Sequence, residues 1–181
     1  MSDVVVLVGN PRPGSRTRIL AEATAAGLVS TLADTAGLTL DAPRVLELAE
    51  ICAVSFGPGP AGPSTVVVDP HGIVRRARLL VVGTPTYKGT YTGLLKVFLD
   101  RYGQRELSGV VAVPVAVAAA EPHRQAVAAG LEALLVELGA TVPVPALALL
   151  ESQLADPEQL AAQWAIEQVP SIVDALKAAN P

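Results

Sequence analysis

Three short, mostly apolar runs set the strongest limit on how this chain folds. They are residues 4–8 (VVVLV), 77–83 (ARLLVVG) and 110–117 (VVAVPVAV). None of them alternates apolar with polar residues, which is typical of strands buried on both faces in a helix-covered parallel sheet. Weaker strands fit residues 42–49 and 141–150. Pro143 and Pro145 cannot donate ladder hydrogen bonds, so the last strand is predicted at a sheet edge.

Amphipathic segments with capping residues separate these runs. They cover residues 15–34, 69–76, 92–102, 122–138 and 157–178. Asp69-Pro70 and Asp156-Pro157 each supply a capping residue followed by proline, and Gly139 is suited to end a helix. Strand and helix therefore alternate about five times. With right-handed crossovers this order predicts an α/β fold, an open, doubly wound parallel sheet with helices on both faces.

Composition excludes several classes of protein. Half of the 181 residues are apolar and 17% are charged, which predicts a packed core in a single domain over residues 1–181. The net charge of −4 offers no basic surplus for nucleic acid. Cys52, the lone cysteine, excludes a disulfide framework. We expect neither a signal peptide nor a membrane segment. The protein is therefore expected to be cytoplasmic. Residues 56–64 (FGPGPAGPS) are expected to form a surface loop.

A polar loop, GNPRPGSRT at residues 9–17, leads from the first strand into the first helix. Ligands of doubly wound sheets bind beyond the carboxyl ends of the strands, and a helix N-terminus favours an anion. The loop adds polar and basic donors: Asn10, Arg12, Ser15, Arg16 and Thr17. Neither G-x-x-x-x-G-K-[ST] nor G-x-G-x-x-G is present. The loop predicts a site for a mononucleotide's phosphate, and the alternative is a capped helix with solvated arginines.

A second loop, within GTPTYKGTYTGLLKVFLDRYG at 83–103, follows the third apolar run. The segment holds four of the chain's six aromatic residues. Pro85 and Thr86 are expected to shape the loop, while Tyr87 offers a ring face and Lys88 a charge. The alternative is that the aromatic residues belong to the core or a subunit contact, and Phe98 is assigned to the core. Beside a phosphate loop, this segment predicts a flat heterocycle on a phosphate tail.

These two stretches resemble the NAD(P)H-dependent FMN reductases of the flavodoxin-like superfamily. They are most similar to the branch associated with alkanesulfonate monooxygenases. The resemblance implies a flavodoxin-like five-stranded parallel sheet of order 2-1-3-4-5. It also implies hydride transfer from NAD(P)H to FMN, with no catalytic side chain, so His71 and His123 are assigned structural roles. The five polar residues of the first loop would hold the FMN phosphate. The flavin ring would be lined by Pro85, Thr86, Tyr87 and Lys88.

The sequence departs from the family after the fourth strand. The family has a Thr-Gly-Gly turn there, and the matching residues are Val117, Ala118 and Ala119. Ala118 and Ala119 would contact the other side of the flavin ring, although alanine adopts positive φ poorly.

Several alternatives stay open at this point. The same fold and flavin also serve reductases of quinones, azo dyes, nitro compounds or metal oxyanions. A flavodoxin-type electron carrier is disfavoured by Arg12 and Arg16, and a relative that has lost flavin is the last alternative. The resemblance further implies a partner monooxygenase and a homodimer or homotetramer. The apolar face at Leu94, Leu95 and Phe98 would permit a dimer.

Overall fold

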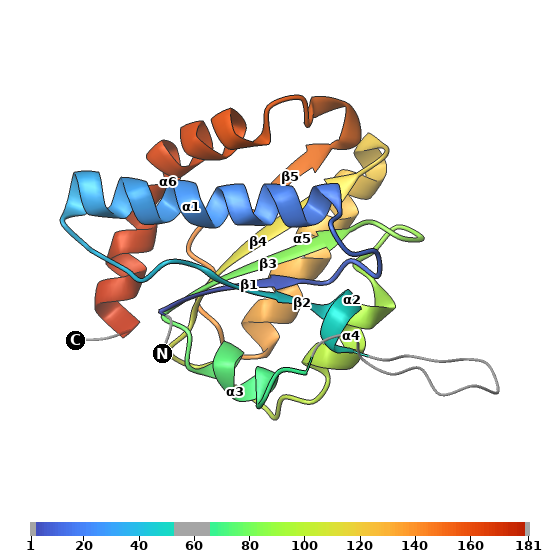
Figure 1. Ribbon diagram of the computed structural model, residues 1–181, viewed down its shortest axis with the longest axis horizontal. Coiled ribbons are helices and arrows are strands. Elements are labelled where there is room, and N and C mark those ends of the chain that lie inside the picture. The colour runs from blue at the N-terminus through green and yellow to red at the C-terminus, as the bar shows by residue number, and fades with distance from the viewer. Residues whose placement is uncertain (1–2, 53–65, 180–181) are drawn as a thin grey trace.

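The computed structural model describes residues 3–52 and 66–179, which are built around one five-stranded sheet (Figure 1). Its strands are β1 (Val4–Val8), β2 (Arg44–Glu47), β3 (Leu79–Pro85), β4 (Val111–Ala118) and β5 (Leu147–Leu150). They lie in the order β2-β1-β3-β4-β5, and every neighbouring pair is parallel. The predicted doubly wound α/β sheet of order 2-1-3-4-5 is therefore confirmed.

Helices cover both faces of this sheet. They are α1 (Arg16–Ala36), α2 (Leu48–Ile51), α3 (Pro70–Arg75), α4 (Gly93–Leu99), α5 (Glu121–Glu137) and α6 (Pro157–Ala179), with a 3₁₀ turn, η1 (Glu151–Gln153). Helices α1 and α6 pack on one face, and α3, α4 and α5 on the other (Figure 1). In β1, Val4, Val6 and Val8 face α1, whereas Val5 and Leu7 face the opposite layer. The apolar runs lack alternation because both faces are buried.

Local sequence signals explain where the helices begin. Ser15 Oγ accepts a hydrogen bond from Arg18 N (3.3 Å) at the start of α1. The two Asp-Pro pairs behave as predicted, because Asp69 Oδ1 accepts from Gly72 N at 2.9 Å and Asp156 Oδ1 from Gln159 N at 3.0 Å. A proline then stands at the first position of each helix.

Two predicted strands are shorter than expected. β2 ends at Glu47, because the apolar pattern of residues 42–49 continues across a junction into α2. β5 begins only at Leu147, and Thr141 makes one isolated bridge to β4 before the two prolines. β5 does lie at the sheet edge, as predicted. The predicted loop at 56–64 lies outside the described residues.

The apolar face of α4 belongs to the core. Leu95 and Phe98 are 0% and 2% exposed, and Leu94 is partly buried against the same cluster. Leu95 and Phe98 are therefore core residues and are not available for the dimer contact that this face was expected to permit. His71 stacks on Phe98 with ring centroids 4.1 Å apart, consistent with a structural role. Within residues 3–52 and 66–179, no helix combines the length and apolar character needed to span a membrane.

Candidate functional site

A pocket of about 290 Å³ lies at the carboxyl ends of the central strands. It is lined by Asn10, Arg12, Pro13, Ser15, Arg16, Thr17, Pro85, Tyr87, Val117 and Glu151. These residues come from the loop after β1, the start of α1, the segment after β3, the end of β4 and η1. The structure thus brings the two loops singled out in the sequence to one cavity, because the carboxyl ends of parallel strands share one edge.

Asn10 shapes the loop between β1 and α1. Its side chain is buried, and Oδ1 accepts a hydrogen bond from Arg12 N at 2.9 Å. Nδ2 donates to Thr17 Oγ1 at 3.3 Å. This Asx turn bends the chain away from the sheet and carries Arg12 to the surface. Asn10 therefore lines the pocket while fixing the loop's path.

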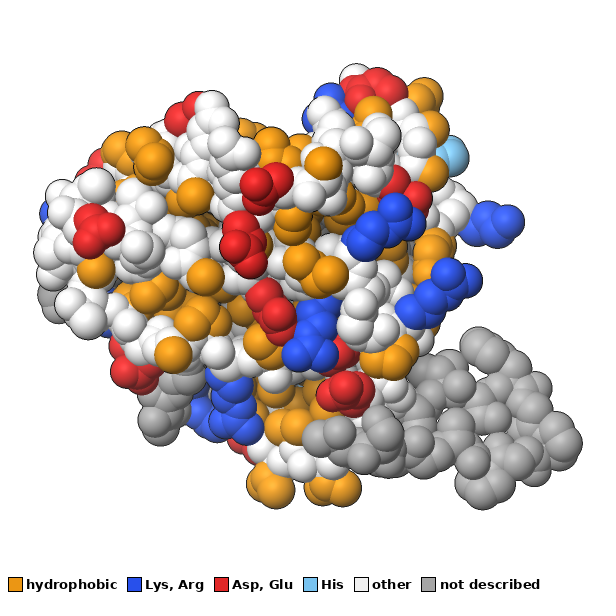
Figure 2. Space-filling view, turned by 45° about the horizontal axis from the view of Figure 1, so that its top comes forward, with side chains coloured by type: hydrophobic (Ala, Val, Ile, Leu, Met, Phe, Trp, Pro, Cys, Tyr) orange, Lys and Arg blue, Asp and Glu red, His pale blue; other side chains and the backbone are white. Residues whose placement is uncertain are grey.

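The pocket presents unpaired donors and positive charge. Among the described residues, the N–H groups of Arg16 and Thr17 have no acceptor, as expected for the first turn of a helix. The guanidinium groups of Arg12 and Arg16 are exposed beside them. Figure 2 shows Lys and Arg side chains exposed at this right-hand end of the molecule. Such a donor set suits an anion with several oxygen acceptors.

A buried carboxylate, Glu47, lies beneath the loop. It stands at the end of β2 with its side chain 1% exposed. Oε1 accepts from Gly14 N at 2.9 Å, and Oε2 accepts from Arg18 Nη1 at 2.6 Å. Gly14 has a φ of +62°, a conformation that glycine adopts readily. Glu47 thus holds the outer turn of the loop against the sheet.

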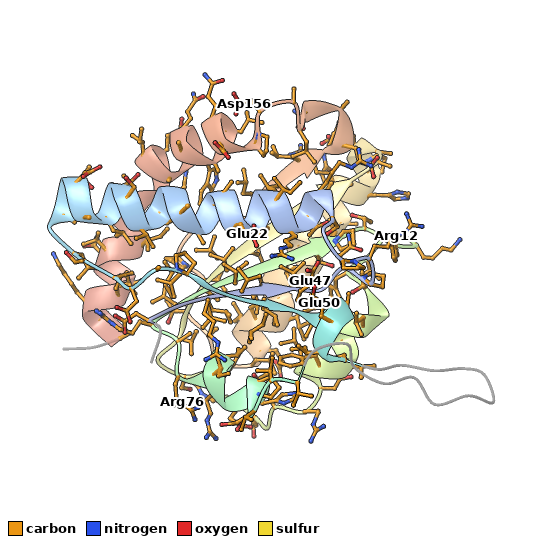
Figure 3. All side chains as sticks on the ribbon, in the orientation of Figure 1. Arg12, Glu22, Glu47, Glu50, Arg76 and Asp156 are labelled. Carbon is orange, nitrogen blue, oxygen red and sulfur yellow. The ribbon has the colours of Figure 1, made fainter. Side chains whose placement is uncertain are left out.

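Arg18 joins Glu47 to a second carboxylate. Its Nε donates to Glu22 Oε1 at 2.7 Å, and Figure 3 shows Glu22 and Glu47 on the same side of α1. The pKa of Arg18 is raised, first by the hydrogen bond to Glu22 and further by Glu47. Sequence reasoning missed Glu47. The available signal was a charged residue at the carboxyl end of an apolar strand predicted beside the first strand.

Another carboxylate, that of Glu151, lines the pocket itself. It begins η1, directly after β5, and its Oε2 accepts from Arg16 Nη2 at 2.9 Å. The two side chains are 46% and 59% exposed, respectively. Sequence reasoning missed this residue too, although it follows the last predicted strand at the same sheet edge. Glu151 compensates part of the positive charge that Arg16 brings.

The second loop forms a tight hairpin at the pocket. Tyr87 N donates to Thr90 O at 3.0 Å, and Thr90 N donates to Tyr87 O at 3.3 Å. Lys88 and Gly89 between them have φ values of +55° and +84°. Positive φ at both central residues is typical of a type I′ turn. Tyr87 is 41% exposed and lines the pocket, so its ring face is available to a ligand.

Four predicted contact residues are not in the lining of this pocket: Thr86, Lys88, Ala118 and Ala119. Thr86 ties the hairpin to β4, because its N and Oγ1 both donate to Val117 O, at 2.9 and 3.2 Å. Lys88 is exposed at the hairpin tip. As ligand contacts, all four stay predictions.

The turn expected after the fourth strand begins later than predicted. Val117 and Ala118 are the last residues of β4, and Ala118 is 1% exposed. Neither Ala118 nor Ala119 has positive φ. This backbone is therefore one that alanine adopts readily, and Val117 lines the pocket.

Thr92 links the two loops. Its side chain is buried, and Oγ1 donates to Gly9 O at 2.5 Å while accepting from Leu95 N at 3.1 Å. Thr92 N also donates to Thr84 Oγ1 at 3.3 Å. Gly9 allows this approach, because a Cβ there would lie 2.7 Å from Leu95 Cβ. The start of α4 is thereby fixed to the end of β1.

The chemistry available here is binding and orientation. Among the described residues no group of three or more His, Cys, Asp or Glu side chains is placed to hold a metal ion. His71 stacks on Phe98 of α4, and His123 lies in the first turn of α5. Neither lines the pocket. The lining itself offers guanidinium and hydroxyl donors, one carboxylate and one aromatic ring.

Comparison with known protein families matches residues 2–153 to the family described as NADPH-dependent FMN reductase. The NADH-dependent FMN reductase SfnF of Pseudomonas putida is 33% identical over 121 residues, which are 66% of this chain and 62% of that protein. The FMN reductase (NADPH) of Escherichia coli K12 is 35% identical over 83 residues, 46% of this chain and 44% of that protein. The matches therefore span less than two thirds of the length of these relatives.

Solved structures share the fold. The apo form of the NADH:FMN oxidoreductase EMOB superposes with a TM-score of 0.64 at 23% identity, covering 98% of this chain and 90% of that one. A WrbA-like flavodoxin from Agrobacterium tumefaciens gives a TM-score of 0.65 at 18% identity, covering 98% and 99%. At these identities the likeness concerns the fold, and it agrees with the flavodoxin-like sheet.

Proposed function

This chain belongs to the NADPH-dependent FMN reductase family, and we propose that it transfers a hydride from NADH or NADPH to FMN. The observation that carries the proposal is the pocket that joins the loop at 9–17 to the hairpin at Tyr87. One end of that pocket offers donors for an anion, and the other offers an aromatic ring. FMN has a phosphate at one end and a planar ring system at the other.

The residues present fit FMN. The N–H groups of Arg16 and Thr17 are unpaired among the described residues and, with the exposed Arg12 guanidinium, suit a phosphate. Pro85, Tyr87 and Val117 supply apolar and aromatic surface for the ring. When bound, FMN would supply the hydride-accepting nitrogen N5 and so carry the redox chemistry.

The protein's own part is to bind and orient. Arg12 and the start of α1 would hold the phosphate, while the type I′ turn keeps the Tyr87 backbone in place beside it. No proton-transferring residue is proposed, because FMN and NAD(P)H would carry the redox chemistry. NADH and NADPH are equal candidates as hydride donors.

Binding measured with and without the phosphate tests this assignment. We expect the protein to quench FMN fluorescence on titration and to oxidise NAD(P)H in air. Arg12→Ala should weaken FMN binding about 10-fold or more, since a hydrogen bond between charged groups contributes about 1.5–3 kcal/mol. Riboflavin, which lacks the phosphate, should bind Arg12→Ala and the parent protein almost equally.

Arg76→Ala is the matched control, because Arg76 follows α3 and pairs with Asp69 far from the pocket (Figure 3). It should leave both affinities unchanged. Equal losses for FMN and riboflavin in Arg12→Ala would show that Arg12 does not serve the phosphate. A protein that neither binds FMN nor oxidises NAD(P)H would overturn the proposed function.

We also propose that the reduced FMN passes to a flavin-dependent monooxygenase and that the protein is a homodimer or homotetramer. Both proposals rest on the family resemblance. With Leu95 and Phe98 in the core, an α4 contact between subunits would use its outer side, where Val97 is 54% exposed. Val97→Glu should then lower the molar mass measured by light scattering, and an unchanged mass would exclude this contact.

A further inference from the structure

Glu151 is an unusual residue for a phosphate pocket, because it brings a negative charge into the lining. Its backbone position is fixed by the turn after β5, where Leu150 N donates to Gln153 Oε1 at 2.7 Å. Its carboxylate accepts from Arg16 Nη2 at 2.9 Å. Both side chains line the same pocket. The pocket thus places one carboxylate oxygen against one of its two arginines.

Two carboxylates lie near this loop, Glu47, which is buried, and Glu151, which is exposed, and they have different partners. Glu47 is buried and is satisfied by Gly14 N and Arg18 Nη1, so it does not need Arg16. Among the described residues, Arg16 is the one side chain that pairs with Glu151. A carboxylate and a phosphate present similar oxygens to the forked donors of a guanidinium. The Glu151 carboxylate and an entering phosphate therefore compete for the same donors.

The exposure of this pair sets the strength of the competition. The side chains of Arg16 and Glu151 are 59% and 46% exposed, so the pair can separate without leaving a buried charge. Exposed ion pairs change an equilibrium by a factor of about 1.4 to 5. The competition is therefore strong enough to weaken a ligand several-fold and too weak to close the site.

We propose that Glu151 is an internal competitor of the ligand's phosphate for Arg16, and that it weakens FMN binding several-fold and speeds FMN release. This inference rests on the proposed function and deepens it. When the phosphate enters, Arg16 exchanges one anionic partner for another, and Glu151 is left facing a like charge. On release, the carboxylate takes Arg16 back. Glu151 is thus a specificity-determining residue that acts on the phosphate and leaves the ring untouched.

Glu151→Gln tests the proposal, because it keeps the shape of the side chain and removes its charge. We expect the dissociation constant for FMN to fall about fivefold, through a slower dissociation rate in stopped-flow measurements. Riboflavin should bind the variant and the parent protein equally. Glu158→Gln is the control, since Glu158 is an exposed acid in the first turn of α6 that does not line this pocket. It should change neither affinity.

A second variant shows whether the effect passes through Arg16. In an Arg16→Ala background, adding Glu151→Gln should lower the dissociation constant for FMN by less than half of the factor that Glu151→Gln gives in the parent protein. An unchanged or weakened FMN affinity in Glu151→Gln would overturn the proposal. An equal gain for FMN and riboflavin would also overturn it, because the effect would then not concern the phosphate.

Inorganic phosphate separates this inference from the proposed function. Titrated by calorimetry, it should bind Glu151→Gln more tightly than the parent protein even if neither binds flavin. If Glu151→Gln binds inorganic phosphate more tightly but neither protein binds flavin, only the assignment of FMN as the ligand would be overturned. Flavin binding by the parent protein with no gain for FMN or phosphate in the variant would overturn the role of Glu151 alone.

Discussion

Replacing Glu47 with alanine is expected to destabilise the protein by about 2 kcal/mol and to loosen the loop at residues 11–14. All four residues of that segment are exposed, so few packing contacts hold them. The Glu47 carboxylate accepts from Gly14 N at 2.9 Å and from Arg18 Nη1 at 2.6 Å. Removing it takes away the bond that holds the outer turn to β2.

The magnitude follows from the partners left behind. Hydrogen bonds to charged groups contribute about 1.5–3 kcal/mol each. The two do not add in full here, because Gly14 is exposed and Arg18 is 33% exposed and keeps Glu22, so both donors regain partners. Glu47→Gln keeps an acceptor for Gly14 N and loses the charge beside Arg18, which predicts a loss of about 1 kcal/mol.

Glu22→Gln is the control for this series. It removes the partly exposed ion pair of Arg18 and leaves the loop untouched, so a loss of about 0.5 kcal/mol is expected. Urea unfolding followed by the fluorescence of Trp164, the single tryptophan, measures all three variants. Amide hydrogen exchange should rise at Gly14, whose N–H donates to Glu47, in Glu47→Ala and not in Glu22→Gln. The reasoning fails if Glu47→Ala is no more destabilising than Glu22→Gln or if exchange in the loop stays unchanged.

Three further outcomes are expected. Thr92→Val removes the cap of α4 and leaves Gly9 O unpaired, so it should cost about 2 kcal/mol in urea unfolding, whereas Thr92→Ser should stay near the parent value. Gly9→Ala should cost about 1–3 kcal/mol in urea unfolding, because its Cβ would meet Leu95 Cβ at 2.7 Å; a free energy of unfolding equal to that of the parent protein would contradict this cause. Burial raises the pKa of the Cys52 thiol above its usual value, and the charge of Arg101 opposes this shift. The rate of alkylation by iodoacetamide should therefore still be rising at pH 9, and a plateau below that pH would count against it.

The sheet was predictable because its sequence signal is local and complete. Val4–Val8 lie between α1 on one side and α3 to α5 on the other, so every residue of the run is buried and no polar position interrupts it. The Asp-Pro pairs at 69 and 156 act within one turn of their helices. Loop 9–17 was found for the same reason, because its donors follow a strand and begin a helix.

The charge balance of the site was not predictable, because its partners are distant in sequence. Glu47 meets Gly14 across 33 residues, and Arg16 meets Glu151 across 135. No spacing rule connects such pairs before the order of the strands is known. The end of β4 lies one residue beyond the predicted run at 110–117, because the apolar residues continue to Ala120 and do not mark where the strand stops at Ala118.

Thr92 has a consequence for how a ligand is recognised. Its hydroxyl joins the carbonyl of Gly9 to the start of α4 across 83 residues of sequence. The two halves of the pocket are therefore held at a fixed separation before any molecule arrives. A molecule seated at one half presents its remainder to the other at a high effective concentration, so a joined ring and phosphate should bind far more tightly than the two fragments supplied separately.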